Sequence, residues 1–322
     1  SQRDFERVIS PLQKVGANFK VNIRKTLPLQ IIGSGFINPI HYIENRGSAQ
    51  CKSTIMLAAL NLPGKTVIKA KKSRDHTENI FKYLGIPIIV KKNKHNDEIK
   101  VVGQKAFSSF KYKVPSDPSS CAFFIVLTLL SKNSELKIKN VNVNDSRIGY
   151  IKILNKMGAK IKIKNIKKRY GEKQADILVK SQKILRKINC SPSLNSNLID
   201  EFLIIFLAAA KAKGVSNFAN LGELNKKESP RLKLGSKLLN QLGIKTKLTK
   251  DSLKIFGNPG IDLKKSIHVK NYFKDHRIFM TSVIAACVFG GKWKIDDASS
   301  YKSSFPSFLK IIKKLGYKFK LG

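Results

Sequence analysis

Two adjacent carboxylates, Asp200 and Glu201, stand directly before the apolar segment Phe202–Ala210. A helix that is apolar on every face belongs inside a domain, so its acidic start must face a cavity or a partner. A carboxylate in such a place is costly unless a cation pairs with it. We therefore expect this point of the chain to belong to a site for a charged substrate.

A polar loop further along the chain carries Lys227, Glu228 and Arg231, whose charges could gather around the two carboxylates. The alternative is that Asp200 caps the helix and that the charged run is a solvated loop. These residues alone do not separate the two interpretations. The rest of the chain favours the site.

The elements that must position these residues recur along the sequence. An amphipathic helix is followed by a glycine and then by a strand rich in lysine and isoleucine, and the glycines suit the left-handed conformation that ends a helix. The five glycines are Gly16, Gly85, Gly158, Gly243 and Gly316. Their spacing predicts a structural unit of roughly seventy residues that is repeated.

A second, more apolar helix is expected in each complete unit, and each of these helices has a polar opening. The openings are Ser48-Ala49-Gln50, Asp117-Pro118-Ser119-Ser120, Asp200-Glu201 and Asp275-His276-Arg277. Capping alone accounts for Asp117 and Asp275. It does not account for Gln50, His276 or Arg277. If the openings converge, their amide donors would hold a small molecule with several negative charges.

The pattern predicts an α/β (α+β) fold of repeated βα units with buried helices. It is neither the open Rossmann pattern nor a simple barrel. A domain boundary is expected near Pro115, which gives a first domain over residues 1–113 and a second over residues 114–322. The first repeat lacks its buried helix and the chain opens on Ser1, so we expect further sequence upstream.

The chain has 62 Lys and Arg against 21 Asp and Glu, a formal net charge of +41. Such a charge would normally indicate nucleic acid or another polyanion. The lysines, however, are spread through every segment, as in Lys160-Ile161-Lys162-Ile163-Lys164, and no basic tail stands out. We attribute most of the charge to composition and expect no nucleic-acid partner. Only ten of the basic residues are arginines, so each arginine is a better indicator of an anion site.

The four cysteines are far apart and show no metal-ligand spacing, which indicates reduced thiols in or near the core of a cytoplasmic protein. They are Cys51, Cys121, Cys190 and Cys287. The longest apolar runs are too short to span a bilayer, and no secretory signal opens the sequence, so no membrane association is expected.

Taken in order, these motifs resemble the EPSP synthase (3-phosphoshikimate 1-carboxyvinyltransferase) family of enolpyruvyl transferases. The resemblance covers nearly the whole chain, and seven short motifs in sequence on a matching repeat are far more specific than any one of them. They are Ser48-Ala49-Gln50-Cys51-Lys52-Ser53, Arg74-Asp75-His76-Thr77-Glu78, Asp117-Pro118-Ser119-Ser120, Ile199-Asp200-Glu201, Glu223-Leu224 with Lys227-Glu228-Ser229 and Arg231, Asp275-His276-Arg277, and Ser304-Phe305-Pro306.

The resemblance implies two domains of repeated βα units, with the first domain incomplete and the active site in the interdomain cleft. It implies transfer of the enolpyruvyl group of phosphoenolpyruvate to the 5-hydroxyl of shikimate 3-phosphate, with release of phosphate, in aromatic amino acid biosynthesis. The reaction proceeds by addition and elimination through a tetrahedral intermediate. No metal or organic cofactor is implied, and a monomer is expected. Motifs that the family has at its N-terminus would lie upstream of Ser1, so the activity of this chain on its own is left open.

The resemblance also assigns roles to residues. Asp200 matches the proton acceptor and Glu228 the candidate acid. Shikimate 3-phosphate would contact Ser48, Ala49, Gln50, Arg74, Asp200 and Lys227. Phosphoenolpyruvate would be held by Arg3, Gln50, Arg231, His276 and Arg277.

Two further polar residues are expected to have structural roles. For His76 a hydrogen bond at a helix start is favoured over catalysis, and Arg147 is expected to anchor a loop. Asn225 and Pro230 depart from the arginine and aspartate that the family has at these positions. Two alternatives stay open: a UDP-N-acetylglucosamine enolpyruvyl transferase, and a non-catalytic polyanion-binding protein of the same fold.

Overall fold

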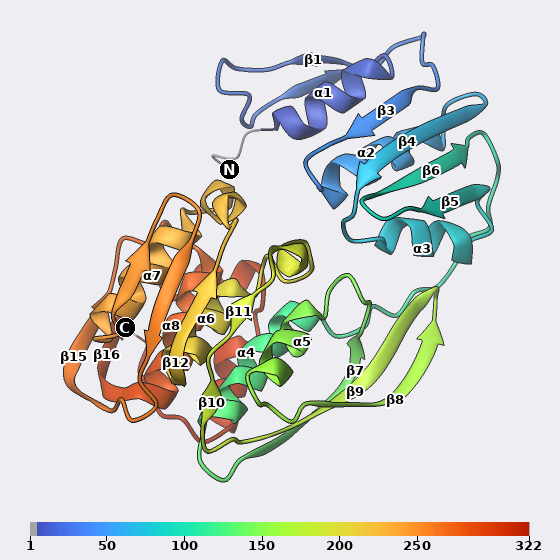
Figure 1. The fold of residues 1–322 in the computed structure, drawn as a ribbon. Coiled ribbons are helices and arrows are strands. Elements are labelled where there is room, and N and C mark those ends of the chain that lie inside the picture. Colours follow the sequence, from blue (N-terminus) through green and yellow to red (C-terminus); the bar gives the residue numbers. More distant parts are fainter. Residues whose placement is uncertain (1–4, 322) are drawn as a thin grey trace. The chain divides into compact units, whose positions relative to one another are not determined.

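The computed structural model describes residues 5–321. The chain forms two compact units (Figure 1): unit 1 comprises Ser1–Val114 and Lys168–Lys173, and unit 2 comprises Pro115–Lys167 and Gln174–Gly322. None of the helices in the described part of the chain is long and apolar enough to cross a membrane.

Unit 1 contains three helices and six strands within its described residues. They are α1 (Glu6–Lys14), β1 (Asn18–Lys20), β2 (Gln30–Ile32), β3 (His41–Glu44), α2 (Ala49–Ala59), β4 (Lys65–Lys71), α3 (His76–Tyr83), β5 (Ile88–Lys92) and β6 (Asn96–Val102). The main sheet has the order β3-β4-β6-β5, with β3 parallel to β4 and the other pairs antiparallel. Alternate residues of β4 are buried, so one face of this sheet covers the core of the unit.

Unit 2 holds the remaining elements, except that the turn between β8 and β9 groups with unit 1. They are α4 (Pro118–Leu130), β7 (Glu135–Asn142), α5 (Gly149–Lys156), β8 (Lys162–Arg169), β9 (Glu172–Lys180), β10 (Leu185–Arg186), β11 (Asn189–Cys190), the 3₁₀ helix η1 (Pro192–Asn197), α6 (Phe202–Ala210), β12 (Ala212–Phe218), η2 (Gly222–Lys226), α7 (Arg231–Gln241), β13 (Thr246–Leu248), β14 (Leu253–Gly257), β15 (Leu263–Val269), α8 (His276–Phe289), β16 (Gly290–Ile295), η3 (Ser300–Ser303) and α9 (Phe308–Lys314). The sheets have the orders β7-β9-β8, β10-β12-β14-β13 with β11 beside β12, and β15-β16.

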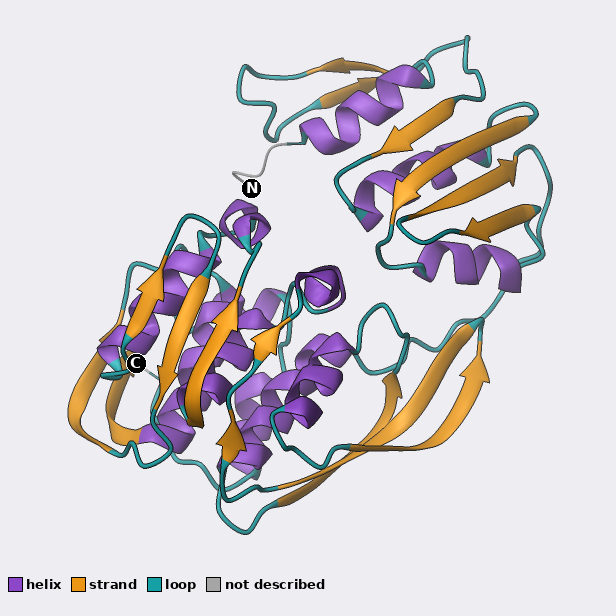
Figure 2. Ribbon diagram, viewed as in Figure 1, coloured by secondary structure: helices purple, strands orange, loops and turns teal. Residues whose placement is uncertain are grey.

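Three helices form the centre of unit 2. Helices α4, α6 and α8 pack against one another, and Figure 2 shows the strands of the unit outside this group of helices. All nine residues of α6 are buried, as its uniformly apolar sequence predicts. Full burial of a large apolar side chain stabilises the folded state by roughly 1.5–3 kcal/mol. The burial of α6 therefore fixes the position of the residues that directly precede it.

The repeated helix ends are confirmed. The five predicted glycines all have positive φ, between +71° and +107°. Four of them lead into strands, but Gly316 does not: residues 317–321 form no strand. Tyr317 instead packs against the core of unit 2, and its hydroxyl lies 3.1 Å from Ser131 Oγ. The strand predicted after Gly316 is therefore wrong.

The cysteines are free thiols, as predicted: three are buried and Cys287 is half-buried. Burial raises the pKa of the thiols of Cys121 and Cys287 to about 12. A thiol with so high a pKa is almost entirely protonated at neutral pH and is a poor nucleophile. These cysteines are therefore structural.

Candidate functional site

The polar openings of the three central helices lie together in unit 2. Arg277, in the first turn of α8, donates from Nη1 to the backbone oxygen of Asp200, before α6, at 2.9 Å. Ser119, in the first turn of α4, donates to the carboxylate of Glu201. The predicted convergence therefore holds for these three openings.

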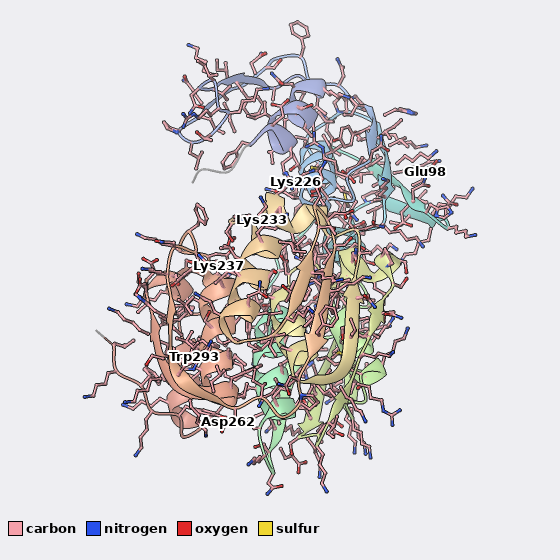
Figure 3. All side chains as sticks on the ribbon, turned by 60° about the vertical axis from the view of Figure 1, so that its left-hand side comes forward. Glu98, Lys226, Lys233, Lys237, Asp262 and Trp293 are labelled. Atoms are coloured by element: carbon pink, nitrogen blue, oxygen red, sulfur yellow. The ribbon has the colours of Figure 1, made fainter. Side chains whose placement is uncertain are left out.

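Arg231 is the hub of the site. It is the first residue of α7, and its side chain turns inward and is only 3% exposed, whereas Lys233 and Lys237 project from α7 to the outside (Figure 3). Both terminal nitrogens of its guanidinium face a carboxylate. Nη1 lies 3.5 Å from Asp200 Oδ1, and Nη2 lies 2.9 Å from Glu228 Oε2. Burial alone would lower the pKa of Arg231, but the charge and hydrogen bonds of Asp275, together with Glu228 and Asp200, raise it.

Asp275 is the third carboxylate that contacts Arg231. Its side chain is fully buried and accepts hydrogen bonds from Arg231 Nε at 2.9 Å and from Ser229 Oγ at 2.7 Å. It also caps α8, because Oδ1 accepts from the backbone N–H of Arg277 at 2.9 Å. The sequence predicted the cap but missed the pairing with Arg231. An aspartate directly before a His-Arg pair was the available signal.

Asp200 is surrounded by cations. Besides Arg231, Lys227 Nζ lies 3.9 Å from Oδ1 and Arg277 Nη2 lies 4.0 Å from Oδ2. The cap of α6 is Glu201, and its side chain makes no capping hydrogen bond. The alternative of a capping Asp200 beside a solvated loop is therefore wrong: loop and carboxylate are in contact. Three cations thus lie within 4.0 Å of the carboxylate oxygens of Asp200.

Glu228 has a different environment. Its Oε2 lies 2.9 Å from Arg231 Nη2 and 3.0 Å from His276 Nδ1. Its side chain is 32% exposed, whereas that of Asp200 is 14% exposed. The same arginine thus holds two carboxylates that differ in exposure and partners. Carboxylates in unlike environments can take opposite proton-transfer roles.

A further polar network lies behind this cluster. Arg147 Nη2 donates to Asp117 Oδ1 at 2.8 Å and to Ser119 Oγ at 2.9 Å, and Ser119 in turn reaches Glu201. Arg147 anchors its loop to the start of α4, which confirms its expected role. Burial of Asp117 would raise the pKa of its carboxyl, but Arg147, the hydrogen bonds from Ser120 and the charge of Arg277 lower it below the ordinary value.

Asp117→Asn tests this network through its pH dependence. A lowered pKa in the folded state stabilises the fold above the ordinary carboxyl value of about 3.9, and this contribution is lost as pH falls through the folded-state pKa. Because asparagine still caps α4, the variant isolates the charge. We expect the free energy of unfolding to fall by about 0.2–1 kcal/mol at pH 7, and by less below pH 3. Denaturant titrations at both pH values check this, with Asp251→Asn as the control. An equal loss at both would contradict it.

The candidate residues of unit 1 form a separate group at the start of α2. Ser48 caps this helix, since its Oγ accepts from the N–H of Cys51 at 3.3 Å. The loop before it closes around the buried Glu44, whose carboxylate accepts the N–H groups of Arg46, Gly47 and Ser48. Three backbone donors fix the loop, so Ser48 has a defined position.

Ala49 and Gln50 follow on the first turn of α2 and are half-buried and exposed, respectively. Arg74 is half-buried in the segment before α3, and its carbonyl accepts a hydrogen bond from Lys52 Nζ at 2.9 Å. His76 begins α3, but instead of the expected helix-start hydrogen bond its Nδ1 lies 2.7 Å from Glu172 Oε1. Arg3 lies outside the described residues.

Glu228, Asp275 and His276 are the one group among the described residues that is close enough to share a metal ion. Arg231 already donates to the carboxylates of both Glu228 and Asp275. A guanidinium that binds these oxygens supplies the positive charge that a metal ion would bring. This donor set therefore fits an arginine-centred cluster better than a metal centre.

The fold is the one found in solved enolpyruvyl transferases. It superposes on the solved enolpyruvyl transferase NikO from Streptomyces tendae with a TM-score of 0.73 at 12% identity, covering 98% of this chain and 71% of that one. It is also similar to the solved EPSP synthase from Acinetobacter baumannii, with a TM-score of 0.83 at 31% identity and the same coverage.

Sequence comparison identifies the family. A family model described as EPSP synthase (3-phosphoshikimate 1-carboxyvinyltransferase) matches residues 1–312. A 3-phosphoshikimate 1-carboxyvinyltransferase from Ruthia magnifica subsp. Calyptogena magnifica is 39% identical over 98% of this chain and 71% of its own length. The protein of the same name from Thermodesulfovibrio yellowstonii is 37% identical over 97% of this chain and 71% of its own length. The chain therefore belongs to the EPSP synthase family, which is a family of transferases.

Proposed function

We propose that this protein transfers the enolpyruvyl group of phosphoenolpyruvate to the 5-hydroxyl of shikimate 3-phosphate and releases phosphate. The reaction belongs to the shikimate pathway. The observation that carries the proposal is the position of Arg231, whose one guanidinium contacts both Asp200 and Glu228. The relatives that bear this activity in their names support it.

Asp200 is proposed as the proton acceptor. The attacking hydroxyl must lose its proton, and a positioned carboxylate can accept it. Asp200 lies 3.5 Å from Arg231 Nη1 and 3.9 Å from Lys227 Nζ. Lys227 would also contact shikimate 3-phosphate, so binding and proton removal would occur at neighbouring atoms.

Glu228 is proposed as the acid that protonates the methylene carbon of phosphoenolpyruvate. Its contact with His276 Nδ1 at 3.0 Å supplies a partner from which it could be reprotonated. Arg231, His276 and Arg277 would hold the carboxylate and phosphate of phosphoenolpyruvate. Each charge-assisted hydrogen bond of this kind contributes roughly 1.5–3 kcal/mol.

The remaining roles rest on the family resemblance. Ser48, Ala49, Gln50 and Arg74 are proposed as contacts of shikimate 3-phosphate. Gln50 and Arg3 are proposed as contacts of phosphoenolpyruvate. Residues 1–113 and 114–322 are proposed as the two domains of the family. We also infer a cytoplasmic monomer that needs no cofactor and has no nucleic-acid partner.

Phosphate release from phosphoenolpyruvate tests the proposal. The purified protein should release phosphate when shikimate 3-phosphate is added and not when UDP-N-acetylglucosamine is added. The same sample should show no retention on immobilised RNA at 150 mM salt beyond that of another protein of equal charge. Turnover with the nucleotide sugar, or RNA retention without any turnover, would contradict the proposal.

A further inference from the structure

Unit 1 contains an ion pair that is almost completely buried. Lys52 Nζ lies 2.5 Å from Glu78 Oε1, and the two side chains are only 1% and 3% exposed. Glu78 Oε2 has no hydrogen-bond partner among residues 5–321. A buried ion pair with an unsatisfied oxygen is weak evidence for stability, because desolvation can exceed the attraction between the charges. The pair is better explained by what it holds in place.

Lys52 also makes a hydrogen bond to the segment that carries Arg74. Its Nζ donates to the carbonyl oxygen of Arg74 at 2.9 Å. One turn of α2 is thereby joined to the segment that links β4 to α3. Beside it, Ser53 Oγ lies 2.7 Å from Thr77 Oγ1 and joins α2 to the first turn of α3.

The Arg74 segment lies outside regular secondary structure. Residues 72–75 belong to no helix or strand, so no regular backbone ladder fixes them. Glu78 lies in the first turn of α3, just after Arg74 in the chain, and pairs with the same ammonium group of Lys52. The carboxylate keeps the ammonium in place, and the ammonium holds the backbone that carries the guanidinium.

We propose that Lys52 is a positioning residue for anion binding at Arg74, with Glu78 as the group that holds Lys52. The arginine binds a phosphate well only when its planar fork is aligned. Lys52 restrains the Arg74 backbone relative to α2, the helix whose first turn carries Ser48 and Gln50. This inference rests on the proposed function, because its main readout is affinity for shikimate 3-phosphate.

The double variant Lys52→Met/Glu78→Met separates positioning from stability. Replacing both charges with apolar side chains of similar length is often neutral for folding, whereas removing only one leaves a buried charge. We expect the double variant to melt near the wild-type temperature. Its affinity for shikimate 3-phosphate, measured by calorimetry, should fall roughly tenfold, since the hydrogen bond from Lys52 to the Arg74 carbonyl is lost.

A matched control lies on the surface of the same unit. Glu98 and Lys100 form an ion pair on β6 at 2.9 Å, and each side chain is 36% exposed (Figure 3 labels Glu98). Glu98→Met/Lys100→Met removes the same charges and should leave the affinity unchanged. A loss equal to that of the buried pair would assign the effect to net charge and overturn the proposal.

Arg74→Ala completes the cycle. If Lys52 acts through Arg74, the double variant should cause no further loss of affinity when Arg74 is already alanine. Additive losses, or wild-type affinity in the double variant, would overturn the inference. If the wild-type protein binds no shikimate 3-phosphate, the proposed function fails instead. In that case, amide hydrogen exchange at residues 72–75 tests the positioning role of Lys52. Faster exchange in the double variant supports this role, and unchanged exchange overturns it.

Discussion

Asp200→Asn should lower phosphate release by about 10² to 10⁴, because a positioned general base typically contributes that much to the rate. Asparagine keeps the shape of the side chain and can still face Arg231 and Lys227, so the fold and the affinity for shikimate 3-phosphate should be largely retained. The loss should therefore appear in kcat more than in KM. Steady-state kinetics with phosphate detection check both constants.

The matched control for this variant is Asp251→Asn, which removes an aspartate from a turn of unit 2. It should retain wild-type turnover. Wild-type turnover in Asp200→Asn itself would contradict the role of Asp200. An equal fall in affinity and in rate would mean that Asp200 binds substrate but does not accept its proton.

Arg231→Met should cause the largest loss of stability. Among the described residues, Arg231 is the only cation that forms an ion pair or hydrogen bond with the side chain of Asp275. That side chain is fully buried. An uncompensated buried charge typically costs about 3–5 kcal/mol, so the unfolding midpoint in urea should fall markedly at pH 7.

Two further variants sharpen that measurement. Arg231→Met/Asp275→Asn removes the uncompensated charge and should recover part of the lost stability. Arg186→Met, at an exposed position on β10, should have little effect. A stability loss in Arg231→Met below about 1 kcal/mol would contradict the description of Arg231 as the hub.

The sequence predicted the parts of the structure that follow from local rules. The apolar face pattern of Phe202–Ala210 predicted its burial, and the five glycines predicted the helix ends, because both depend on short segments. The failure after Gly316 has a tertiary cause. A strand needs a neighbour, and Tyr317 instead lies against Ser131.

The candidate site was only partly predictable. The motifs indicated Asp200, Glu228 and Arg231, but nothing in the sequence showed that three carboxylates would meet on one guanidinium. Asp275 had already been explained as a cap, and Lys52 looked like any of the many other lysines of the chain. Burial distinguishes both residues, and burial depends on contacts between segments far apart in sequence.

The central claim is that enolpyruvyl transfer occurs by addition and elimination, with Glu228 as the acid. In deuterated water an acid that exchanges with solvent delivers deuterium to the methylene carbon of phosphoenolpyruvate, and elimination leaves part of it in the product. Mass spectrometry of the product should therefore show deuterium in its enolpyruvyl group, and Glu228→Gln should form product at least about a hundredfold more slowly. A wild-type product without deuterium, or an unchanged rate in Glu228→Gln, would contradict the account.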